Sequence, residues 1–169
     1  MIRKILDTEP SFAPTVARVC AGVVMFAHGA QKMLGWFGGH GYDATMQSMT
    51  SGMGLPAVAV TLVICAEFFG ALGLIFGCLT RAAALGIAAV MVGAIALVHL
   101  PHGFFMNWMG SQAGEGFEFH IVMIGVMLAL AISGGGKLSV DRWIVQKIRK
   151  WRLERDSDLA LGHHRPSAA

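Results

Sequence analysis

Charged side chains are scarce in this sequence. Of its 169 residues, only 14% are charged while 55% are hydrophobic, and the mean hydropathy is +0.62. A soluble domain carries about 25% charged residues. The depletion therefore argues against an ordinary soluble protein and predicts one that lies in a membrane. The length allows one domain and leaves no room for a separate soluble catalytic domain.

Cysteine is also scarce, and the spacing of the three that occur argues against several cofactors. Cys20, Cys65 and Cys78 lie far apart, in or beside apolar runs, and form no CxxC pair. We expect them to be small packing residues rather than redox or zinc ligands. The sequence also lacks a GxSxG nucleophile motif, a flavin fingerprint, an iron–sulfur cysteine set and a haem-binding histidine pair. We therefore expect no covalently held cofactor.

Histidine and acidic residues do crowd one half of the chain's apolar region, but not in a metal-binding pattern. They are His28, Glu67, His99, His102, Glu115, Glu118 and His120. No pair has the spacing of two ligands on consecutive turns of a zinc-binding helix, and the ligands would come from different segments. We therefore predict no metal site.

Four long apolar runs are the dominant feature of the chain. A helix that crosses a bilayer needs about 17–25 mainly apolar residues. The runs cover about residues 13–34, 56–79, 82–100 and 117–133. They are too long, and alternate too little, for membrane strands. The sequence predicts an all-α fold, an integral membrane four-helix bundle over residues 1–138.

The distribution of basic residues indicates how the spans are oriented. With four spans, both termini and the short link at Thr80 and Arg81 lie on one side, and the two long glycine-rich links lie on the other. The first side carries Arg3, Lys4, Arg81 and a basic tail, whereas Lys32 is the basic residue nearest the long links. The positive-inside rule therefore predicts that both termini are cytoplasmic.

The segment after the fourth span is expected to form an amphipathic helix over residues 139–155. Ser139 suits its N-cap and Asp141 its first turn. The residues expected at a membrane surface are Trp143, Lys147, Arg149, Lys150, Trp151 and Arg152. We expect this helix to lie on anionic lipid headgroups in the cytoplasm rather than to bind nucleic acid. A docking surface for a soluble partner is the alternative, and residues 156–169 are expected to be disordered.

Small residues follow a helical rhythm in two of the spans. They are Ala66, Gly70, Gly73 and Gly77 in the second span, and Ala82, Gly86, Ala89, Gly93 and Ala96 in the third. Such stripes let helix backbones approach closely in lipid, where apolar burial does not drive association. We expect both stripes to pack helices together in the bundle.

Ionisable residues inside the spans are the main functional signal. A rise of about 1.5 Å per residue puts Lys32 roughly 6 Å, His28 roughly 12 Å and Glu67 roughly 16 Å below the membrane surface. With His99 and Glu118, they can all point into the periplasmic half of the bundle. Because charge in hydrocarbon is costly, the cluster indicates a ligand or proton site. The alternative is a neutral Glu67 that holds the helices in register through a hydrogen bond to His28 or a backbone carbonyl.

Several short motifs occur in a characteristic order along the chain. They are "HGAQKMLGWFGG", a lone Glu67 in the second span, "LTRAAAL", "HGFFMN", "GEGFEF" and "SVD". In this order they resemble the DoxX family of small bacterial inner-membrane proteins, over about residues 18–143. The resemblance implies a bacterial inner-membrane location and a role as a component of an oxidoreductase. Carried over by position, the motif residues are His28, Lys32, Trp36, Glu67, Arg81, His102, Asn107, Glu118 and Asp141.

A quinone is the ligand that these residues would suit, because its carbonyl oxygens need hydrogen-bond donors and its tail needs an apolar slot. The candidate site residues are His28, Gln31, Lys32, Trp36, Glu67, His99, His102, Asn107 and Glu118. We expect a quinone-like or lipidic ligand, with electrons supplied by other redox subunits, and an oligomer is compatible with this reading. A small proton-coupled transporter and a structural membrane anchor for a soluble enzyme are the alternatives.

Overall fold

The computed structural model describes residues 6–162, and its regular elements are helical throughout this part of the chain. Three helices are long and apolar enough to cross a membrane, at Ala13–Leu34, Ala57–Phe76 and Thr80–His102. A shorter apolar helix covers Glu118–Ser133. Its 16 residues span about 24 Å, somewhat less than the hydrocarbon core of a bilayer. The all-α prediction is confirmed, and the bounds of these four apolar helices lie within three residues of the predicted spans.

Most elements follow one another with few residues between them, and the loop 103–117 is the longest link in the part of the chain that the structure describes. They are α2 (Ala13–Leu34), α3 (Gly41–Gln47), the π-helical turn η1 (Ser48–Gly52), α4 (Ala57–Phe76), α5 (Thr80–Ala94), the π-helical turn η2 (Ile95–His99), the 3-10 turn η3 (Leu100–His102), α6 (Glu118–Ser133) and α7 (Val140–Gly162). Glycines in the left-handed conformation end α2 and α4, at Gly35 (φ 73°) and Gly77 (φ 68°). This is the usual C-terminal stop of a helix, because glycine lacks the Cβ that would clash there.

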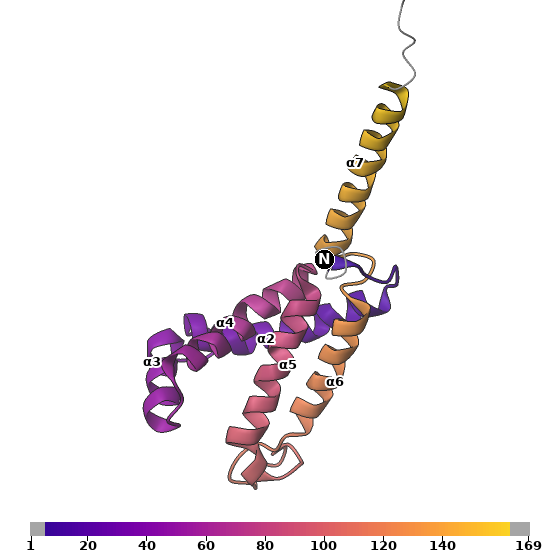
Figure 1. Ribbon diagram of the computed structural model, residues 1–169. Coiled ribbons are helices and arrows are strands. Elements are labelled where there is room, and N and C mark those ends of the chain that lie inside the picture. Colours follow the sequence, from indigo (N-terminus) through magenta and orange to yellow (C-terminus); the bar gives the residue numbers. More distant parts are fainter. Residues whose placement is uncertain (1–5, 163–169) are drawn as a thin grey trace, which may run out of the picture.

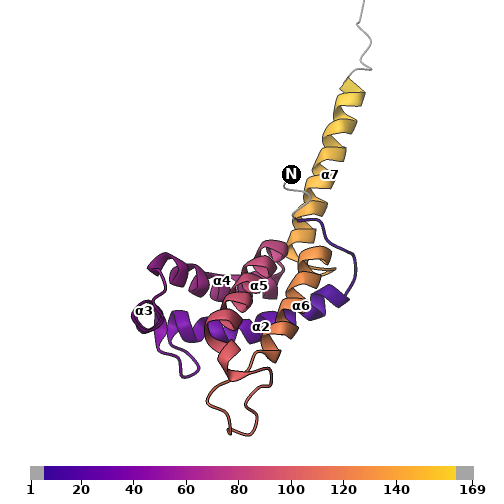
Figure 2. The ribbon, with the colours of Figure 1, turned by 60° about the horizontal axis from the view of Figure 1, so that its bottom comes forward.

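The helices form two arms that diverge from a common junction (Figures 1 and 2). One arm is the pair α2 and α4, with α3 at its far end. The other arm is the pair α5 and α6, with the loop 103–117 at its far end. We call the junction, where α4 ends, α5 begins and α6 connects to α7, the closed end. The far ends of the two arms are the open end.

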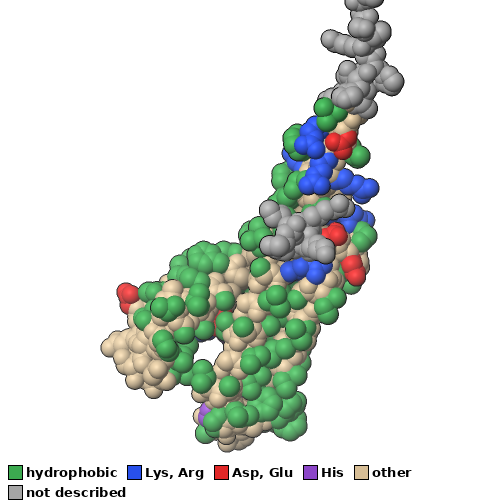
Figure 3. Space-filling model, in the orientation of Figure 1, with side chains coloured by type: hydrophobic (Ala, Val, Ile, Leu, Met, Phe, Trp, Pro, Cys, Tyr) green, Lys and Arg blue, Asp and Glu red, His purple; other side chains and the backbone are tan. Residues whose placement is uncertain are grey.

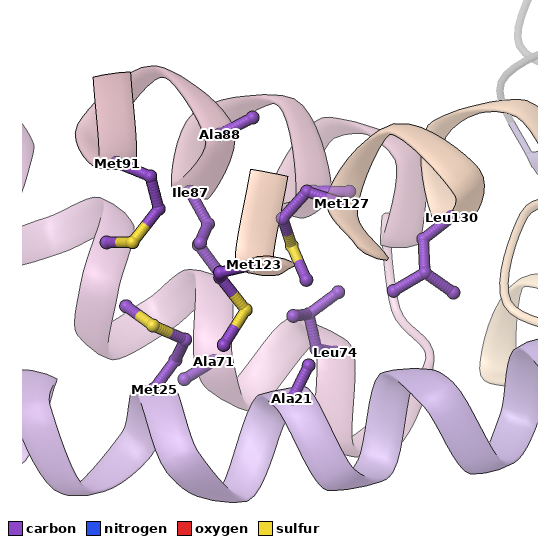
Figure 4. Close-up of a cluster of buried hydrophobic side chains, with 11 residues drawn as sticks. Ala21, Met25, Ala71, Leu74, Ile87, Ala88, Met91, Met123, Met127 and Leu130 are labelled. Carbon is purple, nitrogen blue, oxygen red and sulfur yellow. The ribbon is translucent and has the colours of Figure 1, made fainter. Parts of the chain in front are cut away.

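Buried apolar side chains from all four helices meet between the junction and the middle of the arms (Figure 4). The cluster contains Ala21, Met25, Ala71, Leu74, Ala84, Ile87, Ala88, Met91, Met123, Met127 and Leu130. The four methionines are flexible and fill irregular gaps between the helices. This core joins the two arms while leaving their far ends apart.

The arm of α2 and α4 is packed more closely than its sequence indicated. A Cβ added at Gly29 would lie 2.7 Å from the backbone of Phe68, and one added at Gly22 would lie 3.1 Å from the carbonyl oxygen of Ala71. At Gly29 only glycine fits, and at Gly22 a larger residue would need its neighbours to shift, so both positions bring α2 close to α4. The predicted stripes ran along α4 and α5 instead. Gly70 and Gly73 of α4 do pack against residues of α5 or its preceding turn.

Arg18 lies at the closed end and is buried, with 2% of its surface exposed. Its Nε donates to the carbonyl oxygen of Gly135 (2.7 Å), and Nη1 donates to that of Leu74 (2.7 Å). It also donates to the carbonyl oxygens of Ile75 and Leu138. The end of α4 and the turn after α6 present unpaired carbonyls, and the guanidinium satisfies them.

Asp141 joins α7 to the start of α5. Its Oδ1 accepts a hydrogen bond from the backbone N–H of Leu79 (2.7 Å), and its Oδ2 accepts one from that of Thr80 (2.9 Å). Asp141 therefore caps the N-terminus of α5, in addition to standing in the first turn of its own helix, where we expected it to act. Ser139 does cap α7, because the N–H of Arg142 donates to its Oγ.

Helix α7 extends away from the bundle (Figures 1 and 2). It continues to Gly162, so residues 156–162, which we expected to be disordered, are helical. The remaining part of the expected disordered tail, residues 163–169, lies outside the described residues. Trp143 and Trp151 are exposed, and Lys147 and Arg155 stack over their rings.

Candidate ligand-binding site

A cavity of about 1080 Å³ lies between the two arms, toward the open end. Residues of α2, α3, α4 and α5 line it, together with the first residues of α6. Figure 3 shows the surface hollowed between the arms. A volume of this order is at the upper end of ligand pockets in proteins, which measure about 300–1000 Å³.

An ion pair lies on the wall of this cavity. The Nζ of Lys32 on α2 is 2.6 Å from Oε2 of Glu67 on α4. The Glu67 side chain is 5% exposed and that of Lys32 is 29% exposed. The close approach at Gly29 explains the pairing, because a Cβ there would also lie 2.8 Å from the carbonyl carbon of Glu67. Gly29 thus lets α2 approach α4 one turn before Lys32, within reach of the carboxylate.

The partner of Glu67 differs from the one we considered in the alternative interpretation. There the carboxyl was neutral and bonded to His28 or a backbone carbonyl, whereas in the structure it accepts a hydrogen bond from Lys32. His28 lies one turn away on the same helix and also lines the cavity. Its ring is 6.2 Å from that of Phe119 on α6, between centroids. The imidazole therefore lies between the two arms.

Two more histidines face the cavity from the other arm. The rings of His99, in η2, and His120, in α6, are 4.1 Å apart between centroids. Nδ1 of His99 lies 2.8 Å from the carbonyl oxygen of Glu115 and donates to it when protonated there. His120 is only 7% exposed, and its Nδ1 is buried with no hydrogen-bond partner among the described residues. A buried polar atom without a partner is rare and needs an explanation.

His120 was missing from the predicted site, although its position gave a signal. It precedes Met123 and Met127 by three and seven residues, which places it on the buried face of α6. A histidine that continues the apolar face of a membrane helix should have been counted with His28 and His99.

Two of the predicted site residues build the loop 103–117 instead of lining the cavity. Oε1 of Glu118 accepts hydrogen bonds from the backbone N–H of Met106 (3.0 Å) and from Nε1 of Trp108 (3.2 Å). Asn107 donates to the carbonyl oxygen of Gln112 through Nδ2 and accepts from the N–H of Gln112 through Oδ1. These contacts fold the loop back on itself, and Met106 reaches the cavity from it.

Three other candidates lie at the edges of the site. Gln31 lines the cavity, and its Nε2 donates to the carbonyl oxygen of Phe37 (3.1 Å), which fixes the turn after α2. Trp36 is 54% exposed and packs edge-on against Phe26, with ring centroids 6.5 Å apart. His102 packs in the loop against Gly114, where an added Cβ would lie 2.6 Å from the imidazole ring. The structure therefore brings together His28, Gln31, Lys32, Glu67, His99 and His120.

The chemistry available at the cavity is that of binding and proton exchange. An ammonium, an amide and the four imidazoles of His28, His40, His99 and His120 can donate hydrogen bonds to oxygen atoms of a ligand. The carboxylates of Glu67 and Glu115 and the imidazoles can accept protons. Within residues 6–162, no group of three or more His, Cys, Asp or Glu side chains is arranged to hold a metal ion. The three cysteines, Cys20, Cys65 and Cys78, are free thiols that do not line the cavity.

Comparison with known proteins identifies relatives that cover most of the chain. The family model described as DoxX matches residues 13–100, which include Lys32, Glu67 and His99. "Inner membrane protein YqjF" of Escherichia coli is 36% identical over 132 residues, 78% of this chain and 92% of the relative. "Putative oxidoreductase CatD" of Bacillus subtilis is 28% identical over 127 residues, 75% of this chain and 83% of the relative. "Inner membrane protein YphA" of Escherichia coli is 27% identical over 131 residues, 75% of this chain and 86% of the relative. No solved structure gave a significant match.

Proposed function

The chain belongs to the DoxX family, and from this premise we propose that it is an inner-membrane component of a redox assembly. In this proposal the cavity between the arms binds a quinone-like or lipidic ligand. The name of the Bacillus subtilis relative supports the redox role, and the names of the two Escherichia coli relatives support the location. The ion pair between Lys32 and the buried Glu67, on the wall of the cavity, is the observation that carries the proposal.

The location of this pair argues for a ligand site. Ionisable groups inside a membrane domain are costly and mark substrate, ion or proton pathways more often than they stabilise the fold. A pair that served only to join α2 and α4 is not needed for stability, because well-packed apolar residues in its place often stabilise a fold equally well or better. Here both side chains line a cavity large enough for a ring-shaped head group.

A quinone fits the donors and acceptors at this site. Lys32, Gln31 and His28 can donate hydrogen bonds to a quinone carbonyl, and Glu67 can exchange a proton with the reduced oxygen. Reduction of a quinone to a quinol takes up two electrons and two protons. A separate redox subunit would deliver the electrons, and the ionisable residues of the cavity would pass the protons to the two oxygen atoms.

The orientation belongs to the same proposal. Both termini and the closed end face the cytoplasm, because the basic residues gather there. The cavity then lies in the periplasmic half of the membrane. The exposed tryptophans and basic residues of α7 contact anionic lipid headgroups on the cytoplasmic surface.

A small proton-coupled transporter is the second candidate function. The titratable pair beside a large cavity favours it. Wild-type protein in liposomes separates the two functions. Proton flux coupled to movement of a solute across the vesicle would support transport, whereas quinone binding without such flux would support the redox role.

Purification in mild detergent, followed by extraction and mass spectrometry, tests the redox proposal. We expect a quinone to co-purify with the wild type. Affinity for decylubiquinone should fall at least about tenfold, or about 1.4 kcal/mol, in Glu67→Gln, because the change keeps the shape of the side chain and removes its charge. Glu154→Gln, an exposed carboxylate on α7, is the matched control and should bind as the wild type does. Full quinone binding by a stable Glu67→Gln protein would contradict a role for this carboxylate.

A further inference from the structure

Part of the small-residue face of α5 does not pack closely against another helix. A Cβ added at Gly93 would meet no atom within 4 Å, and one added at Gly86 would meet only the Cβ of Ala66, at 3.8 Å. At Gly22 and Gly29 of α2, by contrast, an added Cβ would lie about 3 Å or less from α4. The glycines of α2 permit close helix packing, whereas Gly86 is in ordinary contact distance of α4 and Gly93 leaves open space. Our expectation that the stripe in the third span packs helices together is therefore wrong at Gly93.

The open space beside α5 is part of the cavity. Gly86, Ala89 and Gly93 line it on one side, and Ala59, Leu62 and Ala66 of α4 line it on the other. We call this part the trough. From Gly86 to Gly93 it extends about 10 Å along the axis of α5. Leu62 and Leu97 at its rim are 64% and 59% exposed, so the trough is open to the outside, which for a membrane span is lipid.

Other residues that line the same cavity are polar, and one of them has an unsatisfied group. The Nδ1 of His120 is buried with no partner among the described residues, although His99 stacks beside it. His28 and the pair of Lys32 and Glu67 line the cavity as well. A cavity with a polar end and an apolar trough matches a ligand that has a polar head and an apolar chain.

We infer that the trough on α5 takes up the apolar chain of a membrane-soluble amphiphile, which enters from the bilayer between α4 and α5 and whose head group hydrogen-bonds to His120. The inference rests on the proposed function for the chemical nature of the head group. It adds the place where the ligand's apolar chain binds and the route by which the ligand enters. It also adds a second hydrogen-bonding residue for the ligand's head group, across the cavity from Lys32. Glycine and alanine are needed at three consecutive turns because a larger side chain would occupy the space of the ligand's chain.

Filling the trough tests the inference directly. Gly93→Leu projects a side chain into the trough, while its Cβ has room. Gly125→Leu on α6 is the matched control, because an added Cβ there also meets no atom within 4 Å and this residue does not line the cavity. Native mass spectrometry of protein from mild detergent measures the bound amphiphile. We expect the wild type and Gly125→Leu to retain it, and Gly93→Leu to lose it at least about tenfold. Equal retention by the two variants would overturn the inference.

A comparison of two quinones separates the contribution of the ligand's alkyl chain to binding from that of its head group. Gly93→Leu should lower the affinity for decylubiquinone at least about tenfold and that for its analogue without the alkyl chain less than about twofold. His120→Phe, which keeps a ring of similar shape, should weaken binding of both quinones. Equal losses for both quinones in Gly93→Leu would mean that the variant distorts the head site, and the trough would not be a chain site.

The same measurements separate failure of this inference from failure of the proposed function. The wild type can bind neither quinone but carry another amphiphile that Gly93→Leu loses. That result would support the trough as a chain site and would overturn the proposal that the ligand is a quinone. If the wild type binds both quinones and Gly93→Leu binds them equally well, the proposed function is supported and the inference that the trough holds the ligand's chain is overturned. A wild type that binds no amphiphile of any kind overturns both.

Discussion

The closed end and the open end of the molecule both hold charged side chains within the helical domain, but they satisfy them differently. At the closed end, Arg18 donates to four backbone carbonyls, and Asp141 accepts from two backbone N–H groups. At the open end, Lys32 and Glu67 bond to each other on the wall of a cavity, and the Nδ1 of His120 has no partner among the described residues. The polar groups named at the closed end therefore have hydrogen-bond partners, whereas one of those at the open end has none among the described residues.

This difference separates charges that hold the fold together from charges that have hydrogen-bonding capacity left for another molecule. A charge whose hydrogen-bonding capacity is filled by helix ends holds the chain together, because removing it leaves several buried backbone groups unpaired. A charge that faces a cavity still has capacity for another molecule. Of the motif residues that the family resemblance singled out, Arg81 and Asp141 belong to the first group, and His28, Lys32 and Glu67 belong to the second. Arg81 resembles Arg18, since it donates to the carbonyl oxygens of Ala131 and Asp7.

The largest effect on stability is expected from Arg18→Met. The change leaves the carbonyls at the end of α4 and after α6 without a donor in a buried place, and we expect a loss of about 3 kcal/mol or more in the free energy of unfolding. Thermal unfolding in detergent measures it. Arg152→Met, at an exposed position on α7, should change stability by less than about 0.5 kcal/mol. Equal unfolding temperatures for the two variants would mean that the guanidinium does not hold the closed end together.

A smaller loss is expected when the cap on α5 is removed. Truncation after Ser139 deletes Asp141 and should cost about 1–2 kcal/mol, the usual value of an N-cap. Truncation after Val145 keeps both Ser139 and Asp141 while removing most of the basic surface of α7. That protein should unfold as the full chain does, and it should bind vesicles that contain anionic lipid more weakly. If both truncations unfold at the same temperature, the cap contributes nothing.

Unlike the closed-end variants, Glu67→Gln should lower ligand affinity while leaving stability nearly unchanged. The amide keeps most of the shape of the side chain and can still accept a hydrogen bond from Lys32, which is partly exposed. We therefore expect stability to change by less than about 1 kcal/mol, the size of a typical hydrogen bond, although ligand affinity falls. Unfolding and quinone titration on the same preparation compare the two quantities. A large loss of stability with unchanged binding would place Glu67 among the structural charges.

Reporter fusions should leave the fold unchanged and show which compartment each end faces. Fusions after Arg155 and at Thr80 should report the cytoplasm, and fusions at Gln47 and Ser111 should report the periplasm. The expected signals follow from the basic residues at the closed end. A periplasmic signal after Arg155 would reverse the orientation and move the cavity to the cytoplasmic half.

The sequence by itself determined the apolar helices and the gathering of several polar residues toward the open end of the bundle. Long apolar runs define the spans, since backbone polar groups in lipid must be paired within a helix. A regular rise then places His28, Lys32 and Glu67 in the same half of the bundle, with His28 nearest to the depth of Glu67. These are local properties of a helix, and for this reason the bounds of α2 and the presence of a polar cluster could be predicted.

Only the tertiary structure decided which residues meet. That Lys32 rather than His28 bonds to Glu67 follows from the close contact of α2 and α4 at Gly29. That Asp141 caps α5, and that Gly93 faces a cavity rather than a helix, depends on the angle at which the two arms diverge. Spacing along a helix fixes a direction from its axis, whereas contacts between distant segments depend on how the axes cross. That crossing is set by the packing of all the side chains in the core at once.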